Sequence, residues 1–194
     1  MWFLIDKCSV KSFCVSLLVV FALSASSQDK KFAVSSNILN LAALGPSVAF
    51  TYNATPRIGY QVYASQGAIW VFDYEFKTVI AEMRYTFWDY LYVGPYVRYI
   101  EKRVVRENEI NSAAVFTVAG RNFYGKGISS GINLGFKYID TKKVNLEAFA
   151  GLGYGRFIKQ IDYDYPNDDR GGFPDARIGL LLGYKWGTIN FKKN

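Results

Sequence analysis

Residues 127–138 read GISSGINLGFKY, and apolar or serine positions in this stretch alternate with positions that carry glycine, serine, asparagine or lysine. An alternation of period two predicts a β-strand with two unlike faces. Glycine weakens a strand unless another group must approach closely, so the glycine-rich face indicates a crowded interior. The apolar face then points outward, and an apolar exterior predicts a lipid environment.

The same division recurs in residues 91–100, 144–155 and 177–186. After residue 27 the sequence shows no helical periodicity and no apolar run of the ~18 residues that a membrane-spanning helix needs. Eight strands are predicted instead, at residues 31–39, 46–53, 58–67, 75–87, 91–101, 123–139, 144–159 and 175–186. These segments match or exceed the ~9–11 residues of a tilted membrane strand, apart from the second, which is slightly shorter.

The connectors fall into two classes. Residues 54–57, 88–90 and 140–143 form tight turns, whereas residues 102–122 and 160–174 form long polar loops. Short turns at one end and long loops at the other are typical of outer-membrane barrels. We therefore predict an all-β fold, a closed eight-stranded antiparallel up-and-down transmembrane barrel. It is expected to be a monomer in the outer membrane, with periplasmic termini and extracellular long loops.

Aromatic residues lie where the strands should cross the two membrane interfaces, as in the girdles of transmembrane barrels. The set near the tight turns is Tyr52, Tyr60, Phe87, Trp88, Tyr90, Tyr138, Tyr184 and Trp186, and the set near the loops is Trp70, Phe72, Phe123, Tyr124, Tyr154 and Phe157. Two soluble alternatives remain open. In a periplasmic β-sandwich these rings would form the core. A lipocalin-type barrel would turn its apolar face inward and its glycines outward.

Residues 1–27 resemble an export signal, with a positive start at Lys7 and Lys11, a short apolar core at 13–25 and small residues before Gln28. The expected organisation is a signal peptide, 1–27, followed by one barrel domain, 28–194. Both cysteines lie in the signal segment and the chain has no histidine. We therefore expect no disulfide, no metal site and no cofactor.

The chain has 23 basic and 16 acidic residues, and removal of residues 1–27 leaves 21 and 15, a net charge of +6. An excess of positive charge suits anionic lipid headgroups or nucleic acid. Because the charges are scattered along the strands, we expect no nucleic-acid partner.

Several segments carry a family resemblance. They are Asn37-Ile38-Leu39-Asn40, Ala81-Glu82-Met83-Arg84-Tyr85, Tyr124-Gly125-Lys126-Gly127, Asn145-Leu146-Glu147-Ala148 and Gly151-Leu152-Gly153-Tyr154. With these motifs the chain resembles an uncharacterised domain family of small Gram-negative outer-membrane barrels, similar in architecture to the transmembrane domain of outer membrane protein A. The resemblance implies a barrel and no particular activity. In addition, Arg177-x-Gly179-x-x-Leu182-x-Tyr184 resembles the recognition signal of the barrel insertion machinery, so this machinery and periplasmic chaperones are expected partners.

Charged residues occur on the inward parity of several predicted strands, and the barrel should bring them together inside. This lumen charge network is predicted to consist of Glu82, Arg84, Arg98, Lys137, Glu147, Arg177 and Lys185. Buried charges need partners, so we expect Glu82 to pair with Arg84 or Arg98, and Glu147 with Lys137, Lys185 or Arg177. We interpret the network as a polar plug. The alternative is a path for protons or ions.

A second set of cations lies just above the predicted outer girdle, at the height of lipopolysaccharide phosphates. The possible lipopolysaccharide contacts are Lys102, Arg103, Arg106, Arg121 and Lys126. Ordinary solvated charge explains these residues equally well, so both interpretations stay open. The aspartates of residues 162–169 resemble a calcium loop, but Pro166 and Phe173 occupy positions where ligands are expected, so we favour a solvated loop.

Without histidine the chain lacks the usual general base of hydrolytic membrane barrels, and Ser129 and Ser130 show no activating neighbour in the sequence. We therefore predict that the protein is not an enzyme. The favoured function is a structural or surface-interaction role through loops 102–122 and 160–174, in contact with outer-membrane lipid and lipopolysaccharide. The alternative is a narrow pore for ions or small solutes, which the large inward side chains of Tyr92, Tyr96 and Phe149 should obstruct.

Overall fold

The computed structural model describes residues 30–42, 45–69, 74–104, 122–164 and 171–188. Within these ranges the chain forms eight strands and one short helix. The elements are β1 (Phe32–Asn37), α2 (Ile38–Ala42), β2 (Ser47–Asn53), β3 (Ile58–Ile69), β4 (Tyr74–Trp88), β5 (Leu91–Val104), β6 (Phe123–Asp140), β7 (Val144–Asp162) and β8 (Gly172–Trp186).

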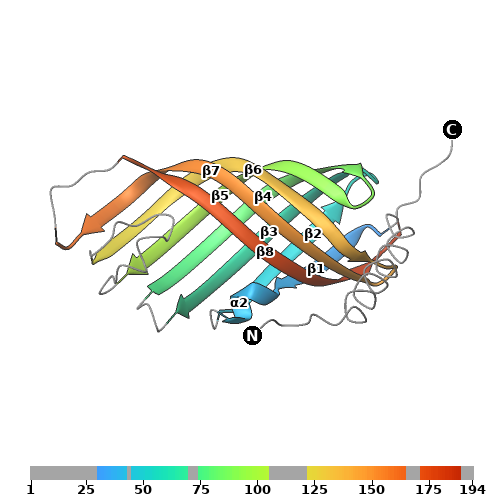
Figure 1. Ribbon diagram of the computed structural model, residues 1–194, viewed down its shortest axis with the longest axis horizontal. Coiled ribbons are helices and arrows are strands. Elements are labelled where there is room, and N and C mark those ends of the chain that lie inside the picture. Colours follow the sequence, from blue (N-terminus) through green and yellow to red (C-terminus); the bar gives the residue numbers. More distant parts are fainter. Residues whose placement is uncertain (1–29, 43–44, 70–73, 105–121, 165–170, 189–194) are drawn as a thin grey trace, which may run out of the picture.

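The strands form a closed barrel in sequence order, and each strand pairs antiparallel with its neighbours (Figure 1). β1 closes the ring by pairing with β8, from Phe32 opposite Trp186 to Asn37 opposite Leu181. The predicted all-β, eight-stranded, up-and-down fold is therefore confirmed. The turns after β2, β4 and β6 all lie at one end, which we call the turn end, and the opposite end is called the loop end.

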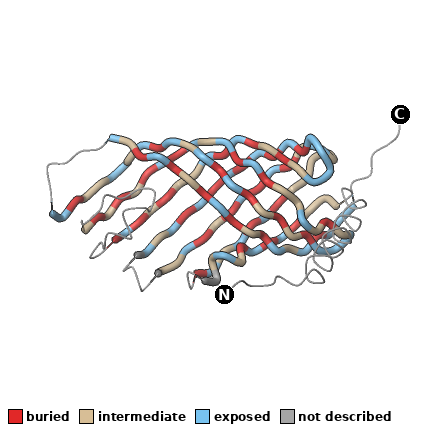
Figure 2. The backbone as a smooth tube through the Cα atoms, in the orientation of Figure 1, coloured by how far each residue is buried: buried red, intermediate tan, exposed pale blue. Residues whose placement is uncertain are grey.

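Burial alternates along every strand (Figure 2). Apolar side chains in the middle of the barrel wall face outward, and Ile132, Leu152 and Ile178 are 64, 74 and 72% exposed. Residues at the alternate positions of the strands face the interior and are buried; Asn133 is 0% exposed and Glu82 is 4% exposed. A water-soluble barrel would show the opposite arrangement. The predicted orientation, apolar outside and polar inside, is confirmed.

The inward glycines make room for side chains from adjacent strands. A Cβ added to Gly135 would lie 2.0 Å from Cζ of Tyr92, and one added to Gly179 would lie 2.3 Å from the ring of Phe149. The crowded interior predicted from the glycine pattern is therefore present.

Two apolar clusters also fill the interior. One contains Ala49, Tyr63, Ile80, Tyr96, Phe149 and Leu181, and the other, toward the loop end, contains Ile100, Phe123 and Phe173 with Phe157 packed against them. The sequence assigned Phe123 and Phe157 to an outer aromatic girdle, and for both residues this assignment is wrong. Phe123 shares the inward parity of Gly125 on β6, Phe157 shares that of Gly155 on β7, and both rings pack inside the barrel. Trp70 and Phe72 lie outside the described residues.

The aromatic residues of the turn end do lie on the outer surface, and Tyr60, Trp88, Tyr138 and Tyr184 are 45–58% exposed. Rings at this end also contact one another across neighbouring strands, for example Tyr52 of β2 against Phe32 of β1 with centroids 5.6 Å apart. Such contacts form a belt of rings at this end, as predicted.

The helix α2 was not predicted, because a single turn is too short to show helical periodicity. The side chain of Asn37 begins it by accepting a hydrogen bond from the backbone N of Leu39 at 3.2 Å. The same oxygen accepts one from the backbone N of Leu180 at 3.0 Å and so ties the helix to β8. Among the described residues, no helix is long and apolar enough to cross a membrane.

The predicted loops are shorter than the sequence indicated. β5 continues to Val104, β7 continues to Asp162 and β8 already begins at Gly172. Parts of the predicted loops 102–122 and 160–174 are therefore strand. Residues 105–121 and 165–170 lie outside the described residues, as do residues 1–29 of the predicted signal segment.

Candidate functional site

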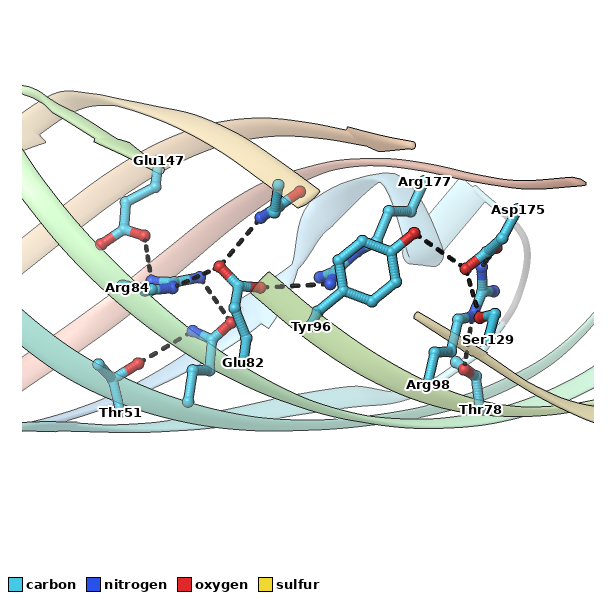
Figure 3. A network of polar contacts seen from close by, with 12 residues as sticks. Thr51, Thr78, Glu82, Arg84, Tyr96, Arg98, Ser129, Glu147, Asp175 and Arg177 are labelled. Atoms are coloured by element: carbon cyan, nitrogen blue, oxygen red, sulfur yellow. Dashed lines mark hydrogen bonds and ion pairs between the residues drawn. The ribbon is translucent and has the colours of Figure 1, made fainter. Parts of the chain in front are cut away.

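The most elaborate polar arrangement is an ion network across the barrel interior, centred on Arg84 (Figure 3). Glu82 and Arg84 are two residues apart on β4, so both side chains point inward. The guanidinium of Arg84 donates from Nε to Glu82 at 3.0 Å, from Nη1 to Glu147 of β7 at 2.9 Å and from Nη2 to Gln61 of β3 at 2.6 Å. All three acceptor side chains belong to nearly fully buried residues. Arg84 therefore links three strands of the barrel wall across the interior.

Glu82 extends the network to the opposite wall. Its carboxylate accepts a hydrogen bond from Nδ2 of Asn133 on β6 at 3.0 Å and one from Nη1 of Arg177 on β8 at 3.2 Å. The guanidinium of Arg177 lies 4.8 Å from the ring centroid of Tyr96 and 4.7 Å from that of Phe149. Cation–π contacts of this kind compensate in part for the lost hydration of a buried cation.

A second ion cluster lies nearer the loop end and is centred on Asp175 of β8. Its carboxylate accepts hydrogen bonds from Arg98 at 2.6 Å, from the Tyr96 hydroxyl at 3.0 Å and from the Ser129 hydroxyl at 2.6 Å. Arg98 also donates from Nε to Thr78 at 2.9 Å. Three donors around a carboxylate that is 2% exposed keep it satisfied without water.

A third ion pair joins Lys185 of β8 to Asp140 at the end of β6, close to the turn end. Lys137 lies on the same inward face of β6, and its register partner on β7 is Glu147. Lys137 has no ion pair within 4.0 Å in the part of the chain that the structure describes.

The seven residues predicted for the lumen network all face the interior. The pair between Glu82 and Arg84 forms as expected. Glu147 instead pairs with Arg84, because Arg84 reaches across the barrel, a distance that no sequence spacing reveals. Sequence reasoning missed Asp175 and Asp140 as carboxylate partners. Asp175 lies two residues before Arg177 on the same face of β8, so its inward position could have been predicted from the sequence. Asp140 falls in a segment that the sequence predicts as a turn.

The cations predicted for lipopolysaccharide contact fall into three groups. Lys102 lies on the inward parity of β5 and is 1% exposed, so its assignment to the outer surface is wrong. Arg103 is exposed and Lys126 is half-buried, and both belong to the outward parity. Arg106 and Arg121 lie outside the described residues. Three further cations that were not predicted for this role also lie exposed on the outer face, namely Lys77, Arg156 and Lys159.

The start of the acidic stretch 162–169 is engaged within the protein. Asp164 accepts hydrogen bonds from the backbone and side chain of Asn122 at 2.6 and 3.4 Å, and its own backbone N donates to Asp162 at 3.1 Å. The remaining aspartates, 168 and 169, lie outside the described residues. In the described ranges, no group of three or more His, Cys, Asp or Glu side chains could hold a metal ion.

Ser129 and Ser130 lie on opposite faces of β6. Ser129 donates its hydroxyl proton to Asp175, a contact that the sequence analysis did not foresee, whereas Ser130 is exposed on the outer wall. The Asp175 carboxylate also accepts hydrogen bonds from Arg98 and Tyr96. The absence of enzymatic activity stays a prediction.

Comparisons with known proteins give one family and two structural neighbours. A family model described as "Protein of unknown function (DUF3575)" matches residues 14–173. The N-terminal β-barrel domain of Pseudomonas aeruginosa OprF is 14% identical, with 81% of this chain and 99% of that chain covered and a TM-score of 0.41. Acinetobacter baumannii CarO is 12% identical, with 84 and 100% covered and a TM-score of 0.41. A search of curated proteins finds no significant match.

Proposed function

The chain belongs to this family of unknown function, and from that premise we propose that it is a non-enzymatic outer-membrane barrel that presents its loop-end connections at the cell surface. The observation that supports the proposal most strongly is the inverted burial of the barrel wall. Large apolar side chains cover the outside, and the charges are enclosed. In water, contiguous apolar surface of this kind is rare and drives association, whereas in a bilayer it is the required exterior.

The aromatic belt at the turn end supports a defined position in the bilayer. Rings such as Trp88 and Trp186 prefer the level of the lipid headgroups. With the tight turns at this interface, the ends of β5 and β7 that lead into the predicted long loops lie at the other one, which is the cell surface in barrels inserted from the periplasm. The recognition-like pattern in β8 supports insertion by the barrel machinery, with periplasmic chaperones as earlier partners and a monomer as the product.

Interior packing favours an anchoring role over the alternative, a narrow pore. Tyr92 and Leu181 are 0% exposed, Tyr96 is 2% exposed and Phe149 is 7% exposed. These side chains come from different walls of the barrel and fill its cross-section together with the Arg84 network. Single-channel recording of the refolded protein in planar bilayers distinguishes the two functions. We expect no stable openings, and reproducible unitary conductance would favour the pore.

Lipid recognition at the loop end is part of the same proposal. Arg103 and Lys126 face outward above the apolar wall, and Tyr124 beside them donates its hydroxyl to Glu101 at 2.9 Å. Their guanidinium and ammonium groups can donate to lipopolysaccharide phosphates. The double variant Arg103→Ser with Lys126→Ser should retain less co-purifying lipopolysaccharide than wild type. Lys143→Ser, at the turn end, is the matched control, and equal retention in both variants would argue against contact at the loop end.

Fractionation followed by gel electrophoresis tests the membrane assignment. We expect the protein in the outer-membrane fraction, migrating faster unheated than boiled in detergent because the closed barrel resists denaturation. Recovery in the soluble periplasmic fraction would refute the proposal.

A further inference from the structure

The barrel interior opens at the turn end into a cavity, which we call the turn-end vestibule. All eight strands contribute to its wall, together with the turn between β2 and β3. Arg84 and Tyr92 form its inner end, since Glu82, the next inward residue of β4, does not line it. Within the described part of the chain the vestibule is therefore blind, and it opens toward the side of the tight turns.

Two buried polar atoms at the vestibule lack a partner among the described residues. The Tyr92 hydroxyl has no hydrogen bond, although the residue is 0% exposed. Asn145 is 3% exposed and donates from Nδ2 to Glu147 at 2.9 Å, but its Oδ1 accepts nothing. Buried polar atoms are nearly always satisfied, so each orphan indicates a missing partner, such as a ligand or ordered water.

The Tyr92 side chain is held rigidly. Its ring lies against Gly135, where an added Cβ would be 2.0 Å from Cζ, and the guanidinium of Arg84 covers it with Cζ 4.5 Å from the ring centroid. These contacts prevent the ring from swinging its hydroxyl oxygen toward another partner. A fixed, unpaired donor at the inner end of a cavity is preorganised for a ligand oxygen.

The charges around the vestibule favour an anion. Its lining carries four cations, Arg57, Arg84, Lys137 and Lys185, but only two carboxylates, Asp140 and Glu147. Arg84 is engaged by Glu82 and Glu147, and Lys185 by Asp140. This leaves Lys137 inside and Arg57 at the mouth without an ion pair within 4.0 Å in the described chain.

We propose that the turn-end vestibule binds a carboxylate or phosphate group, with the Lys137 ammonium and the Tyr92 hydroxyl as donors. The Asn145 Oδ1 accepts a hydrogen bond from a hydroxyl or N–H on the same ligand. The group arrives either as a free small anion or as the terminal carboxylate of a peptide that enters from the turn end. The proposal depends on the cavity and its charges, and it is independent of any role of the loop end.

Calorimetric titration of the refolded full chain in detergent micelles tests the site. The probes are sodium phosphate, sodium acetate and N-acetyl-alanylalanine, with the C-terminal amide of that dipeptide as the uncharged control. We expect saturable binding of at least one of the three anions and none of the amide. Binding of phosphate or acetate points to a free anion, whereas binding of the dipeptide alone points to a chain terminus.

Two variants and one control make the assignment specific. Lys137→Gln should weaken binding about tenfold or more, because a charged donor to an anion is lost. Lys142→Gln removes the same charge from an exposed turn position at the same end and should leave affinity within about twofold. Heat-dependent gel migration verifies that each variant is folded.

Tyr92→Phe provides a second and independent readout. Deleting an unpaired buried hydroxyl should leave the ligand-free barrel as stable as wild type or more stable, while it weakens anion binding several-fold. No saturable heat with any anion would mean that the vestibule holds only water, and this overturns the proposal. So does equal affinity in wild type, Lys137→Gln and Tyr92→Phe.

Discussion

Arg84→Met is the sharpest test of the interior network, because it removes three hydrogen bonds without adding volume. The Arg84 side chain is 6% exposed, and those of Glu82 and Glu147 are 1 and 9% exposed. After the substitution Glu82 keeps two donors, Asn133 at 3.0 Å and Arg177 at 3.2 Å. Glu147 keeps only Asn145, so its charge becomes the uncompensated one. Removing one member of a buried pair costs about 3–5 kcal/mol, and we expect that loss in the free energy of unfolding.

The second substitution Glu147→Gln tests whether the loss of stability in Arg84→Met comes from the unpaired Glu147 carboxylate. In the Arg84→Met background it removes the stranded charge and retains a group that Asn145 can hydrogen-bond. We therefore expect the double variant to recover part of the loss, with a favourable coupling of about 1–3 kcal/mol between the two sites. Glu147→Gln alone should destabilise, since Arg84 then loses one of its two carboxylates.

Urea titration of the barrel refolded into lipid vesicles measures these differences, with the folded fraction read from heat-dependent gel migration and tryptophan fluorescence. Arg103→Met, an exposed arginine without an ion pair among the described residues, is the control and should stay within about 0.5 kcal/mol of wild type. The reasoning is refuted if Arg84→Met falls within about 1 kcal/mol of wild type. Additive losses in the double variant would refute it as well.

Three further substitutions test other parts of the structure. Leu152→Arg, at an outward position that is 74% exposed, should destabilise the barrel in vesicles by about 2–4 kcal/mol; an unchanged urea midpoint would contradict a lipid-facing wall. Gly131→Ala would place a Cβ 2.2 Å from the backbone oxygen of Leu152, and we expect a loss of about 1–3 kcal/mol, against none for the exposed control Ser130→Ala. Asp175→Asn replaces the ion pair to Arg98 with at most a hydrogen bond to a neutral amide and should lower the free energy of unfolding by about 1.5–3 kcal/mol, measured by the same titration.

Much of the fold could be predicted because it repeats a single rule along the chain. Strand positions, inward parity and tight turns all follow from a period-two alternation interrupted by polar residues. The predicted segment 144–159 and the observed β7, Val144–Asp162, begin at the same residue. The register shift opposite Lys126 and Gly127 could not be foreseen, because it depends on how β6 and β7 pair with each other. Beyond it Lys159 is exposed, although its position in the alternation matches that of the inward Phe157.

The sequence predicted which residues belong to the candidate site but not which of them form ion pairs with each other. Inward parity identifies Glu82, Arg84 and Glu147 as members, because Glu147 shares the glycine-bearing face of β7 and the two β4 residues alternate with the apolar Ala81, Met83 and Tyr85. Pairing was less accessible, since an arginine can reach across the barrel as easily as along its wall. Asp140 was lost for a different reason: it lies at the boundary of a strand and a turn, where sequence-based element limits are least certain.

The amino-acid sequence by itself determined which side of each strand is apolar, and thereby the barrel class and its inside-out character. Side-chain period is local, and each residue contributes to it without reference to distant strands. Only the tertiary structure decided which charges meet, that Lys102 lies inside, and that Tyr92 and Lys137 share a blind vestibule. Those facts depend on ring closure, strand tilt and register, which place residues from all eight strands around one axis and which no single segment encodes.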